Sequence, residues 1–103
     1  MNADHLTTLM AQAKRDFRLH LIEQRPVLRA LAERLPDPEA AEQLHQAAHQ
    51  IYGTGGTLGF SAVATAAQAL EAATVPGAVA GDITEAHRRL DEACATLEAE
   101  PTP

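Results

Sequence analysis

The stretch Leu44–Gly59, LHQAAHQIYGTGGTLG, carries the pattern that decides the fold of this chain. One set of its residues recurs at helical spacing and, at about 100° per residue, spans roughly 80° of a helix surface. This stripe consists of Leu44, Ala48, Ile51, Gly55 and Leu58. His49 lies about 140° from Leu44 on the same helical wheel, with Gly53 and Gly56 on its side. The pattern therefore predicts a helix that buries the stripe and turns an imidazole toward solvent, beside backbone without side chains.

The four glycines of this stretch need an explanation, because each costs a helix interior about 1 kcal/mol relative to alanine. In one interpretation the helix ends near Tyr52 and a glycine loop follows. In the other, the helix continues, and Gly53 and Gly56 keep space open so that a large partner can reach His49. The pattern alone leaves both interpretations open.

Length and composition exclude several classes of protein. The 103 residues suffice for one domain with one core, and the three aromatic residues (two Phe, one Tyr) favour closely packed helices rich in Ala and Leu. A formal net charge of −6 without a basic tract argues against nucleic-acid binding. No apolar run is long enough to span a membrane, and the N-terminus lacks the pattern of a signal peptide. The single Cys94 cannot form an internal disulfide, so we expect a cytoplasmic protein.

Ahead of the quoted stretch, residues 4–24 show a helical pattern that continues to Leu35 but is interrupted by Pro26. Proline removes a helical hydrogen bond and bends the axis, so we expect one kinked helix or two helices meeting near Gln24. Asp37 is predicted to cap the next helix, with Pro38 at its first position, over residues 38–58. The residues expected to be buried before Asp37 are Leu6, Met10, Ala13, Phe17, Leu21, Leu28, Leu31 and Leu35.

Two further helices are predicted after Gly59. Phe60 is expected to anchor the turn in the core, and Ser61 to cap a helix that ends before Pro76. Asp82 and Glu85 resemble a capping box at the start of the last helix. The buried positions expected in these helices are Val63, Ala67, Leu70, Ala73, Ile83, His87, Leu90, Cys94 and Leu97.

The predicted elements favour an all-α fold. No segment alternates apolar and polar residues as a strand would, and no internal repeat is present. Long amphipathic segments joined by short turns predict an antiparallel four-helix bundle, with the N-terminal part of the first helix as an extension or cap. We expect residues 1–100 to form a single domain, and residues 101–103 to be a tail or the start of a linker.

The central motif resembles a known family signature. His49-x-Ile51-x-Gly53, with Gly56 and Gly59 after it and Ala69-Leu70-Glu71 downstream, is similar to the histidine phosphotransfer (HPt) domain. The resemblance covers roughly residues 13–97. It implies that His49 is the phosphorylated histidine, that Ile51 is a core residue, and that Gly53 and Gly59 are the signature glycines. Many members of that family have lysine where this chain has Tyr52.

The resemblance implies a phosphorelay function. A neutral imidazole is a good nucleophile near pH 7, and His49 would accept a phosphoryl group from an aspartyl phosphate and pass it to another aspartate. The expected partner is a response-regulator receiver domain, alone or within a hybrid sensor kinase. The chain would be a carrier and not a kinase, because no ATP-binding motif is visible. We expect no cofactor on the chain itself, since Mg²⁺ would be held by the receiver.

The residues around His49 that could support a phosphoryl group are few. Between Arg34 and Arg88 the chain contains no Lys or Arg, so support must come from nearby polar groups or from arginines of another helix, such as Arg15 and Arg18. His45 is more often a solvated neighbour than a ligand. The supporting residues predicted here are His45, Gln46, Gln50, Tyr52, Gly53 and Gly56.

Other functions fit the sequence less well. His45 and His49 stand four residues apart and could share a zinc ion, but Gln46 replaces the glutamate of a zinc protease and no third ligand is close. We therefore predict no metal site. The glycine segment lacks the Gly-Lys-Ser/Thr of a P-loop. The main alternative is a helical interaction module derived from the HPt fold that no longer carries phosphate.

Overall fold

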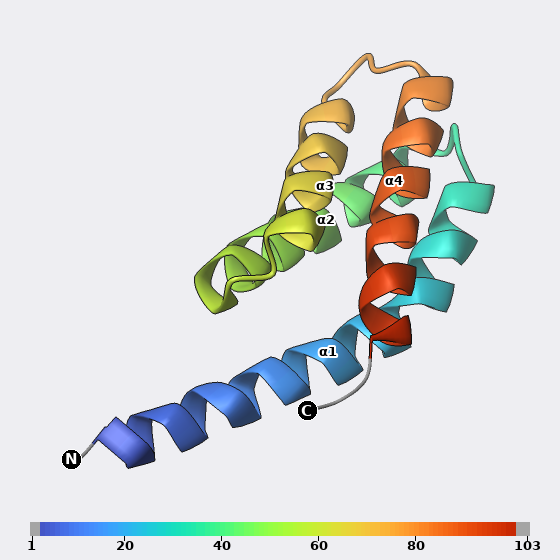
Figure 1. The fold of residues 1–103 in the computed structure, drawn as a ribbon. Helices are drawn as coiled ribbons and strands as arrows, with labels where there is room; N and C mark the ends of the chain where they lie inside the picture. Colours follow the sequence, from blue (N-terminus) through green and yellow to red (C-terminus); the bar gives the residue numbers. More distant parts are fainter. Residues whose placement is uncertain (1–2, 101–103) are drawn as a thin grey trace.

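The structure of the protein, a computed structural model, describes residues 3–100, so the predicted tail at residues 101–103 lies outside the described residues. Within this range the chain forms α1 (Ala3–Glu33), α2 (Pro38–Leu58), α3 (Ser61–Ala73) and α4 (Ala80–Ala99), with no strand. Consecutive helices pack side by side, and α4 returns against α1 (Figure 1). The predicted antiparallel four-helix bundle is confirmed.

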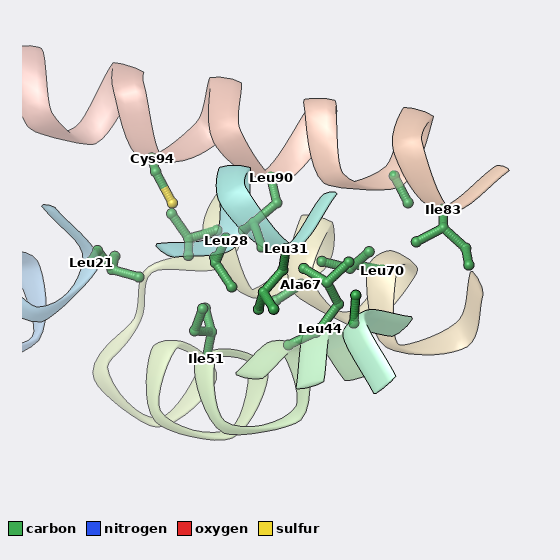
Figure 2. Packing of buried hydrophobic residues seen from close by; sticks show 14 of the residues in the cluster. Leu21, Leu28, Leu31, Leu44, Ile51, Ala67, Leu70, Ile83, Leu90 and Cys94 are labelled. Atoms are coloured by element: carbon green, nitrogen blue, oxygen red, sulfur yellow. The ribbon is translucent and has the colours of Figure 1, made fainter. Parts of the chain in front are cut away.

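The core is built from one apolar stripe on each helix, and the stripes point toward a shared interior (Figure 2). The largest fully buried side chains are one leucine from each helix, namely Leu21, Leu44, Leu70 and Leu90. Each contributes about 1.5–3 kcal/mol of apolar burial. Ala48 and Ala67 are fully buried as well, and their small side chains allow α2 and α3 to approach closely. The register of α2 is thereby fixed, with the side opposite Leu44 facing outward.

α1 is a single helix that contains Pro26 in its interior. Pro26 has no N–H to donate to the carbonyl of Ile22, and the axis of α1 changes direction in this region (Figure 1). Of the two alternatives, one kinked helix is therefore correct. The bend lets the C-terminal half of α1, with buried Leu28 and Leu31, follow the bundle.

The N-terminal half of α1 corrects one prediction. Leu6 and Met10 were expected to be buried, but they are 56% and 45% exposed. The first turns of α1 extend past the neighbouring helices, so the apolar stripe continues where no helix covers it (Figure 1). Burial begins at Phe17, whose ring packs on that of Phe60 with 5.3 Å between centroids. The predicted extension of the first helix is confirmed, and so is Phe60 as a core anchor.

Both ends of α2 form as predicted. The Asp37 carboxylate accepts a hydrogen bond from the Glu39 N–H, and Pro38 occupies the first turn. At the C-terminus, Gly59 adopts a left-handed conformation (φ 86°), which favours glycine, and the Phe60 N–H donates to the Gly55 carbonyl at 2.8 Å. The helix thus continues through the glycines instead of ending near Tyr52.

Two predicted caps are wrong. Ser61 is the first residue of α3, and the N-cap position is held by Phe60 because its ring is needed in the core. α4 begins at Ala80, two residues before Asp82, and no side chain caps it. Asp82 therefore lies in the first turn, where its charge favours the helix dipole. Glu85 instead pairs with Arg88, which lowers the pKa of the Glu85 carboxyl to about 2.

The contact between α1 and α4 carries most of the interhelical ion pairs. Arg25 donates to Asp91 at 3.0 Å and also contacts Glu98, while Arg29 lies 3.4 Å from Asp91. The hydrogen bond from Arg25 lowers the pKa of Asp91. Arg18 donates to the carbonyl of Glu98 at the end of α4. These cations of α1 are therefore directed toward α4.

Two residues with reactive side chains are packed in α4. Cys94 is buried, as predicted, and burial raises the pKa of its thiol to about 11. His87 is also buried, and its Nε2 has no hydrogen-bond partner in the described part of the chain. Burial lowers the pKa of His87, so the neutral ring is favoured in the folded protein. Both residues contribute to packing.

Candidate functional site

His49 lies in the middle of α2 on the side opposite the buried stripe. Its side chain is 70% exposed, as the sequence predicts. The flanking residues Ala48 and Ile51 are buried, and their packing holds the helix in this register. The imidazole therefore stands on a rigid element and faces solvent.

The His49 ring is held by a carboxylate from α3. Its Nδ1 lies 3.0 Å from Oε1 of Glu71, whose side chain is 25% exposed. An ionised carboxylate can only accept a hydrogen bond, so Nδ1 carries the proton in this contact. In the neutral ring, the lone pair is then on Nε2. The contact sets both the tautomer and the orientation of the imidazole.

Glu71 was not among the predicted site residues, although the Leu70-Glu71 pair belongs to the motif that resembles the family. The signal that could have found it is the orientation of α3. Buried Leu70 and Ala67 fix which side of α3 faces the core, and this register brings Glu71 beside α2. The pairing of Glu71 with a particular residue of α2 depends on the interhelical register, which one sequence does not give.

His45 corrects a prediction. It was expected to be a solvated neighbour of His49, but it is partly buried, with its Nδ1 2.8 Å from Thr74 Oγ1 and 3.1 Å from the carbonyl of Glu71. A carbonyl only accepts, so the His45 Nδ1–H is the donor. His45 thus ties α2 to the C-terminal turn of α3, directly at the backbone of the residue that holds His49.

The glycines beside His49 differ in what surrounds them. A Cβ added at Gly53 or Gly56 would meet no atom within 4 Å, and both residues are exposed. A Cβ at Gly55 would instead lie 3.4 Å from the Phe17 ring, because Gly55 belongs to the buried stripe. Only Gly53 and Gly56 therefore leave open space outside the helix, on the side where His49 stands.

Two hollows meet at His49. The larger one, of about 850 Å³, lies between α1 and α2, and the smaller one extends toward α3. His49 and Gln50 line both. The larger is also lined by Ala13, Asp16, Phe17, His20, Ile51, Gly53, Thr54, Thr57 and Leu58, and the smaller by His45, Gln46 and Glu71.

No Lys or Arg is among the residues that line these two hollows. Lys14, Arg15 and Arg18 line a separate hollow with Phe60 and Leu97. Arg15 and Arg18 were considered as possible neighbours of a phosphoryl group, and this placement does not bring them to His49. The carboxylates among the lining residues are those of Glu71, which contacts His49, and Asp16.

Of the other predicted supporting residues, Gln46 and Gln50 line hollows at His49, and Tyr52 lies three residues further along α2. Gln46 and Gln50 are exposed. Tyr52 is 37% exposed, and its hydroxyl accepts a hydrogen bond from Gln68 Nε2 at 3.4 Å. Gln68, like Glu71, was not singled out from the sequence. No group of three or more His, Cys, Asp or Glu side chains within residues 3–100 is arranged to hold a metal ion.

The fold is a helical module that carries an exposed imidazole held by a carboxylate of the neighbouring helix. The family model of the Hpt domain matches residues 3–100, and the chain belongs to this family, as the resemblance implied. Hpt domains are phosphocarrier modules of two-component signal transduction. No curated protein and no solved structure matches the chain. None of the helices described here is long and apolar enough to cross a membrane.

Proposed function

We propose that this Hpt domain relays a phosphoryl group between the aspartates of response-regulator receiver domains through His49. The observation that carries the proposal is the exposed imidazole whose Nδ1 is engaged by Glu71 at 3.0 Å. This arrangement leaves the Nε2 lone pair to attack from solvent. The phosphorylated residue, its supporting residues and the identity of the partner are parts of this proposal.

The chemistry follows from the state of the ring. Nε2 attacks the phosphorus of a partner's aspartyl phosphate, the N–P bond forms as the P–O bond to the aspartate breaks, and the aspartate leaves as a carboxylate. The ring then carries a positive charge with its proton on Nδ1. The Glu71 carboxylate stabilises this charge across the same hydrogen bond. Transfer to a second receiver reverses these steps.

The surroundings of His49 suit the approach of another protein. Gly53 and Gly56 leave space on the same side of α2, so the acidic pocket of a receiver can come close to Nε2. Mg²⁺ held by the receiver supplies most of the charge neutralisation during transfer. The chain itself contributes the nucleophile and its orientation and acts as a carrier without kinase activity. We also propose that it works in the cytoplasm, together with these receivers.

His45 has a positioning role in this proposal. Its hydrogen bonds to Thr74 and to the Glu71 carbonyl fix the end of α3 against α2. Glu71 is thereby held at the distance that its carboxylate needs to orient His49. Gln46 and Gln50, at the rim of the hollows, are polar contacts for the partner.

The experiment is transfer from a phosphorylated receiver. Receiver domains encoded in the same genome are charged with labelled acetyl phosphate, freed of the donor and mixed with the purified chain. We expect label on the wild type and none on His49→Gln. The matched control is His20→Gln, which removes an exposed histidine from the larger hollow and should keep the label. A chain that binds a receiver but takes no label would favour the interaction module instead.

A further inference from the structure

The contact between Tyr52 and Gln68 repeats the contact between His49 and Glu71 one turn away. Tyr52 follows His49 by three residues on α2, and Gln68 precedes Glu71 by three residues on α3. Residues three apart on a helix are neighbours on its surface. Because the two helices are antiparallel, the two interhelical hydrogen bonds lie side by side along the same contact. The Tyr52 hydroxyl is therefore on the side of α2 where His49 stands.

The polarity of this hydrogen bond leaves the Tyr52 proton available. Gln68 Nε2 can only donate, so the Tyr52 oxygen accepts and keeps its own O–H for another acceptor. No acceptor for that proton is recorded in the part of the chain that the structure describes, and the side chain is 37% exposed. The Tyr52 hydroxyl can thus donate its proton while its oxygen is held by the hydrogen bond from Gln68.

The charges around His49 make such a donor necessary. A phosphoryl group carries about −1.5 to −2 charges near pH 7. It would form on a ring that contacts the Glu71 carboxylate, in hollows that Asp16 also lines and that no Lys or Arg lines. Arg25 and Arg29 are engaged with Asp91 on the other side of α1. Stabilisation by the chain itself must therefore come from groups other than Lys and Arg, among them neutral donors.

We propose that Tyr52, held by Gln68, donates a hydrogen bond to the phosphoryl group on His49 and stabilises the phosphorylated form without a cation. Tyr52 is then a phosphoryl-binding residue and Gln68 a positioning residue. This inference rests on the proposed function of His49. It predicts that the phosphorylated form is stabilised by a direct hydrogen bond from the Tyr52 hydroxyl. A hydrogen bond of this kind is only weakly screened by salt, in contrast to the attraction of a lysine.

The test is the equilibrium between the phosphorylated chain and a phosphorylated receiver, measured as the ratio of the two labelled species. An equilibrium ratio does not depend on how fast the proteins dock, so a change in the contact surface alone does not move it. Tyr52→Phe removes only the hydroxyl and should lower the ratio about 3- to 10-fold. Thr57→Val is the matched control, since the Thr57 hydroxyl already donates to the Gly53 carbonyl at 2.9 Å. It should leave the ratio within twofold.

Gln68→Glu tests the positioning role. A carboxylate at residue 68 would accept the Tyr52 proton and should lower the ratio by about as much as Tyr52→Phe. In the Tyr52→Phe background the same change should have a clearly smaller effect, because no hydroxyl is left to redirect. Equal effects in both backgrounds would contradict the role of Gln68.

A third variant distinguishes a hydrogen bond to the phosphoryl group from attraction by a positive charge. Tyr52→Lys should retain phosphoryl acceptance, and its ratio relative to wild type should fall as salt increases. A labelled wild type whose ratio is unchanged in Tyr52→Phe overturns the inference and leaves the proposed function of His49 intact. A wild type that no receiver labels, or labels elsewhere than His49, overturns both.

Discussion

Two interhelical contacts of this bundle use polar side chains in opposite ways. Between α1 and α4, Arg25 and Arg29 meet Asp91, and Arg25 also contacts Glu98, so cations and carboxylates neutralise each other. Between α2 and α3, the hydrogen bonds join His49 to Glu71 and Tyr52 to Gln68, with no Lys or Arg. The first contact pairs opposite charges, whereas the second leaves the His49 and Tyr52 side chains partly exposed, as the proposed function requires.

The two contacts also differ in where they place positive charge relative to His49. The arginine pairs join α1 to α4, and the hollow on the glycine side of α2 is open and lined by no Lys or Arg. A receiver brings its own Mg²⁺ in the proposed transfer, so a fixed cation beside His49 is not required for neutralisation. We therefore expect the α1–α4 contact to affect stability and the α2–α3 contact to affect transfer, and substitutions can test each contact separately.

The largest expected effect is steric and concerns the open side of α2. Gly53→Leu places a side chain where a Cβ now meets no atom within 4 Å, so the fold accepts it. The approach of a receiver to His49 would be obstructed, and a penalty of about 1.4–2.8 kcal/mol slows transfer roughly 10- to 100-fold. The rate of label transfer measures this effect.

Its control is Gly81→Leu on α4, another exposed helical glycine with open space around its Cβ position. Gly53→Leu should raise the free energy of unfolding by roughly 0.8 kcal/mol, because leucine favours a helix interior over glycine. Gly81→Leu should raise it by less, since Gly81 lies in the first turn of α4. Only Gly53→Leu should slow transfer. Equal transfer rates in the two variants would show that the bare side of α2 is not the docking side.

The next effect belongs to the contact between α1 and α4. Arg25→Met removes the bonds to Asp91 and Glu98, and both Arg25 and Asp91 are about four-fifths buried. We expect the free energy of unfolding to fall by about 1–2 kcal/mol, with transfer through His49 unchanged. Denaturant unfolding measures the loss.

Arg88→Met is the comparison for this variant. Arg88 pairs with Glu85 and Glu92 on its own helix at the surface, where solvent screens such pairs and they add little to stability. If the two variants lost equal stability, the interhelical pairs would have no special role. If Arg25→Met abolished transfer in a folded protein, the assignment of stability to one contact and transfer to the other would be wrong.

The smallest effect is a pH dependence that comes from His87. Burial lowers its pKa below the ordinary value of 6.5, Arg29 adds to this shift, and Asp91 opposes it. The unfolded chain therefore binds a proton at a higher pH than the folded chain does. The contribution of His87 is complete above about pH 6.5 and is lost as the pH falls below it.

The measurement compares the wild type with His87→Leu, in unfolding experiments between pH 7 and pH 5. The wild type should lose more stability over this range than the variant, since leucine has no charged form to be excluded. Parallel pH profiles would contradict the assignment. Transfer through His49 should follow neither profile, because His87 is buried in α4 and lines neither hollow at His49.

Sequence periodicity predicted most of the fold because each helix buries one stripe. It was wrong at Leu6 and Met10, since the helical pattern does not reveal where neighbouring helices end. It also misplaced the caps at Ser61 and Asp82, where core packing of Phe60 and an earlier helix start override the local preference. Local motifs indicate a helix boundary only when tertiary contacts agree.

At the candidate site, the sequence predicted the exposure of His49 and the open space at Gly53 and Gly56, which depend on the register of α2 alone. It did not predict the hydrogen bonds of His45, nor the contacts of Glu71 with His49 and of Gln68 with Tyr52. Those contacts depend on how far α3 slides along α2, and no short-range pattern specifies this offset. Contacts within one helix were predictable, and contacts between helices were not.

The most direct test is to find which atom of the chain carries the phosphoryl group. The chain is labelled with ¹⁵N at histidine, phosphorylated by a receiver, and examined by ¹⁵N and ³¹P NMR at alkaline pH. Because Glu71 engages Nδ1, the account predicts one phosphohistidine, at His49, with the phosphorus on Nε2. Phosphorus on Nδ1 of His49, or on any other residue, would contradict it.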